Sequence, residues 1–266
     1  MQATILPHLV AALLLVPAAL VPWRREPARD GAFWTATGLA TAVALGWATV
    51  QVEPHWSAGF ATALWLTVAV SLLAFVVLAM LAAEVWKLAG LLCPYLVLLA
   101  LVAAVWSQEP ARAVAEATPP AWFGVHVLLS LATYVLLTLA AVSGAAVLLQ
   151  EHALKRRERT RATRALPSLA DAEMLEYRLL GASELVLAAG IVTGMGAQYA
   201  TDGSLMAFSH KTVLTIAAFA VIGALLLARR IWGTRGRRAA RYVLVGYLLL
   251  SLAYPGVKFV TDVLLA

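Results

Sequence analysis

Two of the five histidines in this sequence, His126 and His210, have side chains and positions suited to binding a metal-centred cofactor. Each stands near the start of a long apolar segment, and both segments are predicted to run inward from the same membrane face. Neutral imidazole nitrogens are common axial ligands of heme iron, and two of them at one level of a helix bundle can hold the iron from both sides. The pair therefore predicts axial ligation of heme, with two merely solvated interfacial histidines as the alternative.

Lys258 is an ionisable residue inside the last apolar segment, in its outward third. Such a residue is costly unless it snorkels, finds a partner or serves a site. Its ammonium group is a candidate partner for a heme propionate or another anion. Alternatively, it snorkels outward or pairs with Asp262 one turn on. Glu184 is a second intramembrane charge without a partner that the sequence can name, and His8 and His55 are expected to be surface residues.

Membrane-spanning helices must position these side chains. Of the 266 residues, 62% are apolar and only 13% are charged, whereas a soluble domain carries about a quarter charged residues. A bilayer core about 30 Å thick needs roughly 20 apolar residues, which in lipid must be helical. Eight segments qualify, at about 3–22, 32–52, 60–83, 86–106, 121–149, 177–197, 209–230 and 242–265.

The orientation of the chain follows from its basic residues. Clusters of basic residues occupy the first, fifth and seventh connections, the third holds Lys87, and the even connections hold almost none. The positive-inside rule places basic connections in the cytoplasm, so both termini are predicted on the outer, periplasmic face of a bacterial cytoplasmic (inner) membrane. The net charge of +6 thus reflects topology and predicts no nucleic-acid partner.

We expect a single transmembrane domain over residues 1–266, with four helices in 1–110 and four in 111–266. The fold class is therefore all-α, a polytopic integral membrane helix bundle. A lone cysteine, Cys93, can form no internal disulfide, and without a CxxCH motif the chain cannot itself carry a covalent c-type heme. The sequence contains no HExxH, GxSxG or P-loop motif, so we expect no enzymatic activity.

Two local patterns predict details of the C-terminal helices. Ser168 precedes Asp171 by three residues, which is typical of a capped helix start leading into the sixth segment. Gly190, Gly194 and Gly196 include a small-xxx-small spacing, which predicts close packing of that helix against a neighbour.

From the fifth segment onward the sequence resembles the cytochrome c assembly membrane-protein family, and specifically its short bacterial YpjD/HemX-like branch. The resemblance covers roughly the C-terminal 145 residues, with its motifs in the family's order. They are His126-Val127 with Leu131–Tyr134 and Gln150-Glu151; Leu166–Leu169 with Glu173 and Tyr177-Arg178; His210–Leu214 with Arg229 and Trp232–Arg238; and Tyr254, Gly256, Lys258 and Phe259.

The resemblance implies a protein that binds or handles heme, here heme b, near the outer membrane face during cytochrome biogenesis. His126 matches the first histidine of the family's heme-handling members, and His210 lies in the region of the second. Those members present heme on a Trp-rich outward loop, but residues 198–209 contain no Trp. Besides the lipid bilayer, the implied partners are heme and cytochrome assembly components.

Two other functions remain open on the residues alone. A permease for a small anionic solute would use Lys258 and Glu184 in its pathway. A structural partner of another membrane complex would need neither a cofactor nor a transported solute. The sequence leaves the oligomeric state undetermined.

Overall fold

A computed structural model of the protein describes residues 5–24, 28–52, 59–107, 120–158, 160–203 and 209–260. Every regular element in these residues is a helix, and seven helical spans are long and apolar enough to cross a membrane. This confirms the predicted polytopic helix bundle. The spans lie on α1 (Ile5–Arg24), α2 (Gly31–Val52), α3 (Phe60–Leu81), η1 with α4 (Val85–Leu88 and Ala89–Val105), α5 (Pro120–Arg156), α7 (Leu169–Asp202) and α8 (His210–Trp232).

The eighth predicted segment, 242–265, falls on a helix that is interrupted toward its C-terminal end. The 16-residue α9 (Gly236–Ser251) continues through a π-helical turn, η2 (Leu252–Gly256), into the short α10 (Val257–Phe259). Pro255 lies within that turn, and because proline has no N–H it disturbs the regular hydrogen-bond ladder. The side to which the termini face remains a prediction.

The chain divides into two compact units. Residues 1–113, 146–172 and 258–266 form the first, and residues 114–145 and 173–257 form the second. Both α5 and α7 therefore belong partly to each unit, with residues 120–145 of α5 and 173–202 of α7 in the second.

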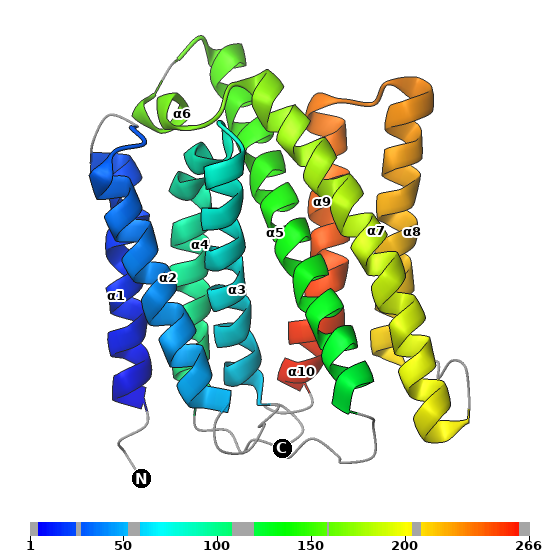
Figure 1. Ribbon diagram of the computed structural model, residues 1–266. Helices are drawn as coiled ribbons and strands as arrows, with labels where there is room; N and C mark the ends of the chain where they lie inside the picture. Colours follow the sequence, from blue (N-terminus) through cyan, green and yellow to red (C-terminus); the bar gives the residue numbers. More distant parts are fainter. Residues whose placement is uncertain are drawn as a thin grey trace. The chain divides into compact units, whose positions relative to one another are not determined.

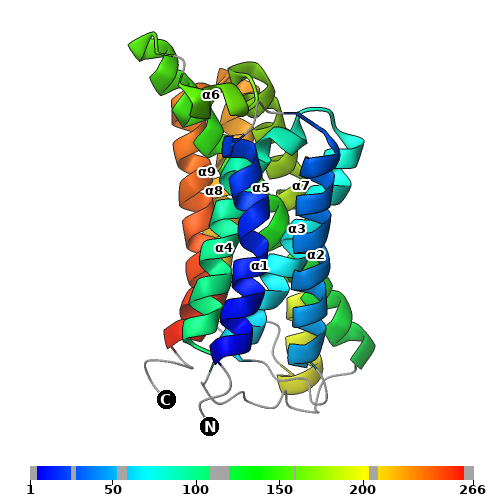
Figure 2. The ribbon, with the colours of Figure 1, turned by 90° about the vertical axis from the view of Figure 1, so that its left-hand side faces the viewer.

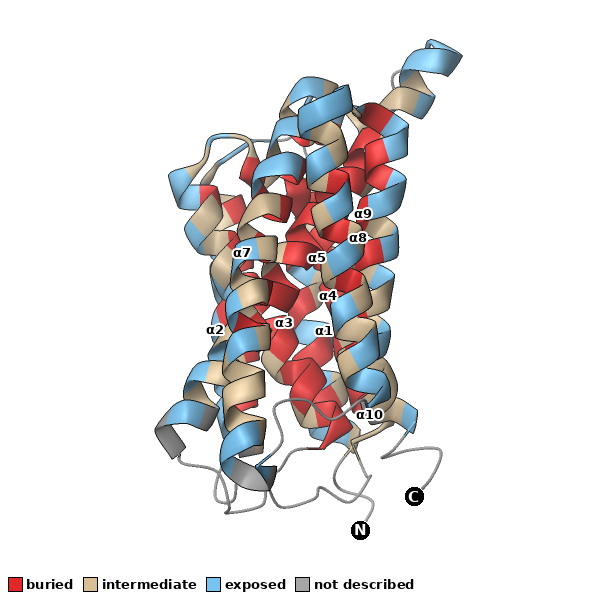
Figure 3. Cartoon of the chain, turned by 90° about the vertical axis from the view of Figure 1, so that its right-hand side faces the viewer, coloured by how far each residue is buried: buried red, intermediate tan, exposed pale blue. Residues whose placement is uncertain are grey.

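In the first unit α1, α2, α3 and α4 pack in chain order, and α4 closes the ring against α1. Figure 1 shows the four helices together, and in Figure 2 α1 stands between α4 and α2. Trp65 and Phe75 of α3 are completely buried. Exposed leucines such as Leu13 and Leu98 cover the outside, as expected for surfaces that face lipid acyl chains. Figure 3 colours the chain by burial and shows buried and exposed stretches alternating along the helices.

The helices of the second unit, α5, α7, α8 and α9, also contact one another in a ring. A glycine lies at each close approach, because the absence of a Cβ lets neighbouring helices come together. The contacts are Gly196 with Trp122 for α5 and α7, Gly223 with Glu184 for α7 and α8, Gly246 with Ile222 for α8 and α9, and Gly144 with Ala240 for α5 and α9.

The predicted start of the sixth span is confirmed. Ser168 caps α7: its Oγ accepts a hydrogen bond from the Asp171 backbone N–H at 3.3 Å and donates one to the Asp171 carboxylate. From Leu169 the helix runs unbroken to Asp202. The cap satisfies backbone groups that would otherwise lack partners at the helix start.

Candidate ligand-binding site

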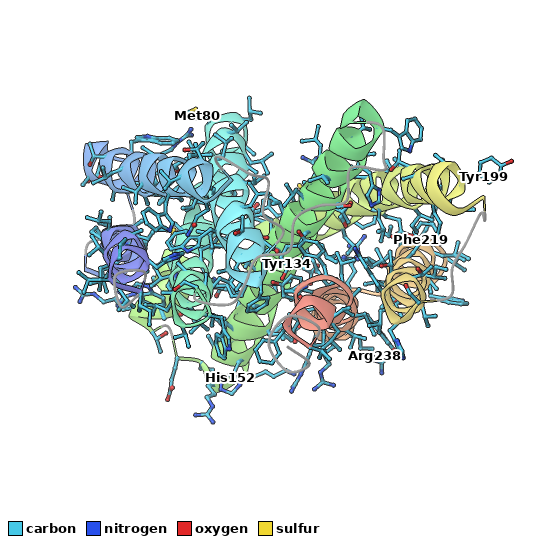
Figure 4. The ribbon with its side chains drawn as sticks, turned by 90° about the horizontal axis from the view of Figure 1, so that it is seen from below. Met80, Tyr134, His152, Tyr199, Phe219 and Arg238 are labelled. Carbon is cyan, nitrogen blue, oxygen red and sulfur yellow. The ribbon has the colours of Figure 1, made fainter. Side chains whose placement is uncertain are left out.

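A cavity of about 320 Å³ lies within the second unit. This volume is at the lower end of the usual range for small-molecule sites, roughly 300–1,000 Å³. Tyr134 of α5, which is labelled in the view along the helices in Figure 4, is one of the residues that line the cavity. The polar lining consists of His126, Ser130, Thr133, Tyr134, Gln198, Ser209, Lys211, Thr212, Thr215 and Tyr254, and the apolar lining includes Leu187, Ile191, Met195, Ile216 and Leu250.

His126 forms part of the α5 wall and is half-buried. Its ring packs directly on α7 at Gly194, where an added Cβ would lie only 2.9 Å from the His126 Cε1 atom. One turn earlier on α5, Trp122 packs in the same way on Gly196 and donates a hydrogen bond to the Thr193 carbonyl at 3.0 Å. The predicted close packing at these glycines is therefore confirmed.

Thr193 orients the imidazole of His126. The Thr193 Oγ1 atom lies 3.2 Å from His126 Nδ1, and 3.0 Å from each of the Ala189 and Gly190 carbonyl oxygens. Carbonyls can only accept, so the hydroxyl hydrogen points to one of them and the hydroxyl oxygen accepts from Nδ1–H. In a neutral imidazole this leaves Nε2 unprotonated and able to bind a metal, which is the usual way a protein fixes the tautomer of a ligand histidine.

Of the two histidines that the sequence paired, only His126 is among the residues that line the cavity. His210 is the first residue of α8 and its side chain is exposed, and it is not among the residues that line the cavity. The next residue, Lys211, is also exposed, but it lines the cavity. Successive helical residues point about 100° apart, since one turn holds 3.6 residues. His210 as a second iron ligand stays a prediction.

Sequence reasoning missed Lys211. It lines the cavity together with His126, and its Nζ atom lies 5.8 Å from the centre of the Tyr254 ring. A signal was available in the sequence, because Lys211, Thr212 and Thr215 form a polar face at the start of an otherwise apolar helix.

Two other predicted residues fall where the structure gives no side-chain position. Lys258 lies in α10, but the structure gives no position for its side chain, so its role as a propionate partner stays a prediction. His55 lies outside the described residues.

The prediction that His8 is a surface residue is wrong. His8 is only 6% exposed, because indole rings from α2 and α3 enclose it. Trp65 Nε1 donates to His8 Nδ1 at 2.9 Å, Trp47 Nε1 lies 3.4 Å from the same atom, and the Gln51 amide lies 2.7 Å from His8 Nε2. Both ring nitrogens thus have protein partners, and this histidine has a packing role.

Charged residues are also buried between α7 and α8. Arg229 Nη2 lies 3.5 Å from Glu176 Oε2, with the carboxylate fully buried and the guanidinium side chain 7% exposed. Glu184 packs against Gly223 two turns further along α7. Among the described side chains, Glu176, Glu184 and Arg229 each retain one buried polar atom without a hydrogen-bond partner. Intramembrane groups of this kind are costly and commonly functional.

A polytopic helical bundle with an oriented histidine in the wall of a cavity defines a class of membrane proteins that bind a small molecule between their helices. Comparison with known families identifies the family to which the chain belongs. The chain belongs to the family described as cytochrome C assembly protein, which matches residues 32–265. This membership supports a role in cytochrome c biogenesis, whereas the YpjD/HemX-like branch stays a prediction.

One curated relative matches over the full length of both chains. It is 46% identical over 270 residues and is described as an uncharacterized 28.8 kDa protein in the nifR3-like 5′ region of Azospirillum brasilense. No solved structure matches the chain significantly.

Family membership suggests heme, and the residues of the cavity fit that group. His126 offers its Nε2 atom, because Thr193 holds the imidazole in the tautomer that carries its hydrogen on Nδ1. Gly194 of α7 lets the His126 ring pack against that helix, and apolar residues such as Ile191 and Ile216 suit the faces of a porphyrin. The small volume means that a macrocycle held here is only partly enclosed.

Proposed function

We propose that this protein binds heme b in the cavity of its second unit and handles it during cytochrome c biogenesis, without catalysing a reaction itself. The supporting observation is His126, a half-buried histidine of the cavity wall whose Nδ1 is engaged by Thr193. Such an arrangement keeps the other ring nitrogen ready for a metal.

Each residue of the site has a separate task in this proposal. The bound group supplies an iron centre, and His126 holds that iron from the α5 side. Thr193 keeps the imidazole in one tautomer and one orientation. His210 stands at the start of α8 as the predicted second ligand, and Lys258 as the predicted propionate partner.

Partial enclosure suits handling better than permanent storage. A cavity of about 320 Å³ that adjoins the start of α8 leaves part of a macrocycle accessible to another protein. Together with the predicted topology, this supports exchange of heme with assembly partners at the outer face of the inner membrane.

The experiment is a visible absorption spectrum with a pyridine hemochrome assay of the detergent-purified protein, expressed with ample heme. We expect a Soret band that weakens or shifts in His126→Ala. His8→Ala is the matched control, because it removes a histidine whose two ring nitrogens both have protein partners, so its Soret band should persist. A colourless wild type, or an unchanged spectrum in folded His126→Ala, would refute the proposal.

A permease for a small anionic solute is the second candidate. The buried ionisable residues between α7 and α8 favour it, since Glu184 and the Glu176–Arg229 pair follow the cavity along α7. This candidate predicts solute flux in proteoliposomes that Glu184→Gln abolishes while His126→Ala leaves it intact. Flux that survives Glu184→Gln would remove its basis.

A further inference from the structure

We propose that Lys211 recognises an ionised carboxylate on the ligand of this cavity. The ligand class is then a flat, mainly apolar molecule with a carboxylate at one edge. This inference rests on the proposed heme site and names the residue that would hold the acidic edge of the macrocycle.

The charge balance of the cavity favours an anion. None of the described residues that line it is acidic, whereas Lys211 brings an ammonium group to it. The described ion pairs join Lys87 to Glu84 and Arg229 to Glu176, so neither involves Lys211. A positive charge beside a cavity without a protein counter-charge is suited to a negatively charged ligand group.

The environment of Lys211 also orients the ammonium group. Its Nζ atom lies 5.8 Å from the centre of the Tyr254 ring, within the distance for an attractive cation–π contact. The contact restrains the long side chain without using up its hydrogen-bond donors. Restraint of this kind reduces the entropy lost when a ligand binds.

The start of α8 adds to the positive potential. Ser209 caps the helix by accepting a hydrogen bond from the Thr212 backbone N–H at 3.2 Å, and Lys211 lies within the first turn. The amino end of a helix carries a partial positive charge that favours anions. Ser209, Thr212 and Thr215 also line the cavity and bring hydroxyl groups to the same end.

Lys211 and His126 face one space from different helices. His126 lines the cavity from α5 and Lys211 lines it from α8. A ligand can therefore have its centre at His126 and its acidic edge at Lys211. The sequence alone favoured Lys258 for this task, but Lys211 is the lysine that the structure places in the cavity lining with His126.

The test compares heme with heme dimethyl ester, in which both carboxylates are neutral. Each is titrated into detergent-purified apoprotein of the wild type, Lys211→Met and Lys211→Arg, with the Soret band as readout. Lys155→Met is the control for loss of a lysine, because Lys155 is an exposed residue in the last turn of α5. Thermal unfolding of each variant shows that the fold is retained.

We expect Lys211→Met to weaken heme binding about tenfold to a hundredfold, the range for losing a charge-assisted hydrogen bond. The same variant should bind the dimethyl ester as the wild type does, and Lys211→Arg should retain most of the heme affinity. Equal losses for heme and ester, or no loss for heme, would overturn the role of Lys211 while leaving the heme site standing. A wild type that binds neither compound would instead refute the proposed function.

Discussion

Replacing Gly194 by alanine should move the His126 ring while changing the stability of the fold very little. An added Cβ at Gly194 would lie 2.9 Å from His126 Cε1, 3.5 Å from Nδ1 and 3.7 Å from Nε2. Ordinary carbon–carbon contacts are about 3.5–4.0 Å, so the ring must move by roughly 0.6–1.1 Å. The imidazole is the far end of a flexible side chain, and therefore we expect it to move while the α7 backbone stays in place.

The expected change in the stability of the fold is small, whereas the expected change in heme affinity is large. Replacing a mid-helix glycine by alanine favours the helix by up to about 1 kcal/mol, and an off-rotamer side chain costs about 0.5–1.5 kcal/mol. These terms nearly cancel, so the free energy of unfolding should change by no more than about 1 kcal/mol. The 3.2 Å contact between His126 Nδ1 and Thr193 Oγ1 is lost, however, and disturbing such an orienting partner typically weakens metal binding about 10–100-fold.

The assay is a heme titration alongside thermal unfolding in detergent. Gly181→Ala is the matched control, since Gly181 lies on the same helix, outside the cavity lining, with nothing within 4 Å of an added Cβ. Gly181→Ala should bind heme as the wild type does. The reasoning is refuted if Gly194→Ala binds heme with wild-type affinity, or if it unfolds at a much lower temperature, which would mean that the helix yields and not the ring.

Three further substitutions test the packing by denaturant unfolding in detergent. Glu176→Ala leaves the Arg229 guanidinium buried without its partner and should cost about 3–5 kcal/mol; a loss below about 1 kcal/mol would show that the pair is dispensable. Trp65→Phe removes the donor 2.9 Å from His8 Nδ1 and should cost about 1–3 kcal/mol without changing the Soret band, whereas a loss of colour would place this cluster in the heme site. Ser168→Ala removes the α7 cap and should cost about 1 kcal/mol, with Ser168→Asp restoring the stability.

The helices were predictable because each depends on local sequence. Apolar runs about 20 residues long can only be helices in lipid, and all seven long spans lie close to their predicted positions. The start of α7 follows from the side chain of Ser168 and the residue three positions on. The last span was less predictable, since the π-helical turn at Pro255 divides a run that reads as one apolar segment.

The cavity could not be predicted in the same way, because it depends on which helices touch. The sequence offered His210 and Lys211 as neighbours, and only the rotation of α8 decides which side chain lines the cavity. Residue type alone favours His210, because histidine is a common iron ligand. The role of Gly194 likewise depends on the packing of α5 against α7, which brings the His126 ring onto this residue.

His8 and His126 show why residue type and depth do not determine a binding site. Both lie within the first two turns of the helix that opens a four-helix ring, and both contact the second helix of that ring. In the first unit, Trp47 and Trp65 fill the space around the imidazole and supply its hydrogen-bond partners. In the second unit the neighbouring position on α7 is Gly194, so the imidazole packs on bare backbone and a cavity remains beside it. The capacity to bind a ligand therefore depends on the small residues that surround a histidine, and a search for such sites should begin with those residues.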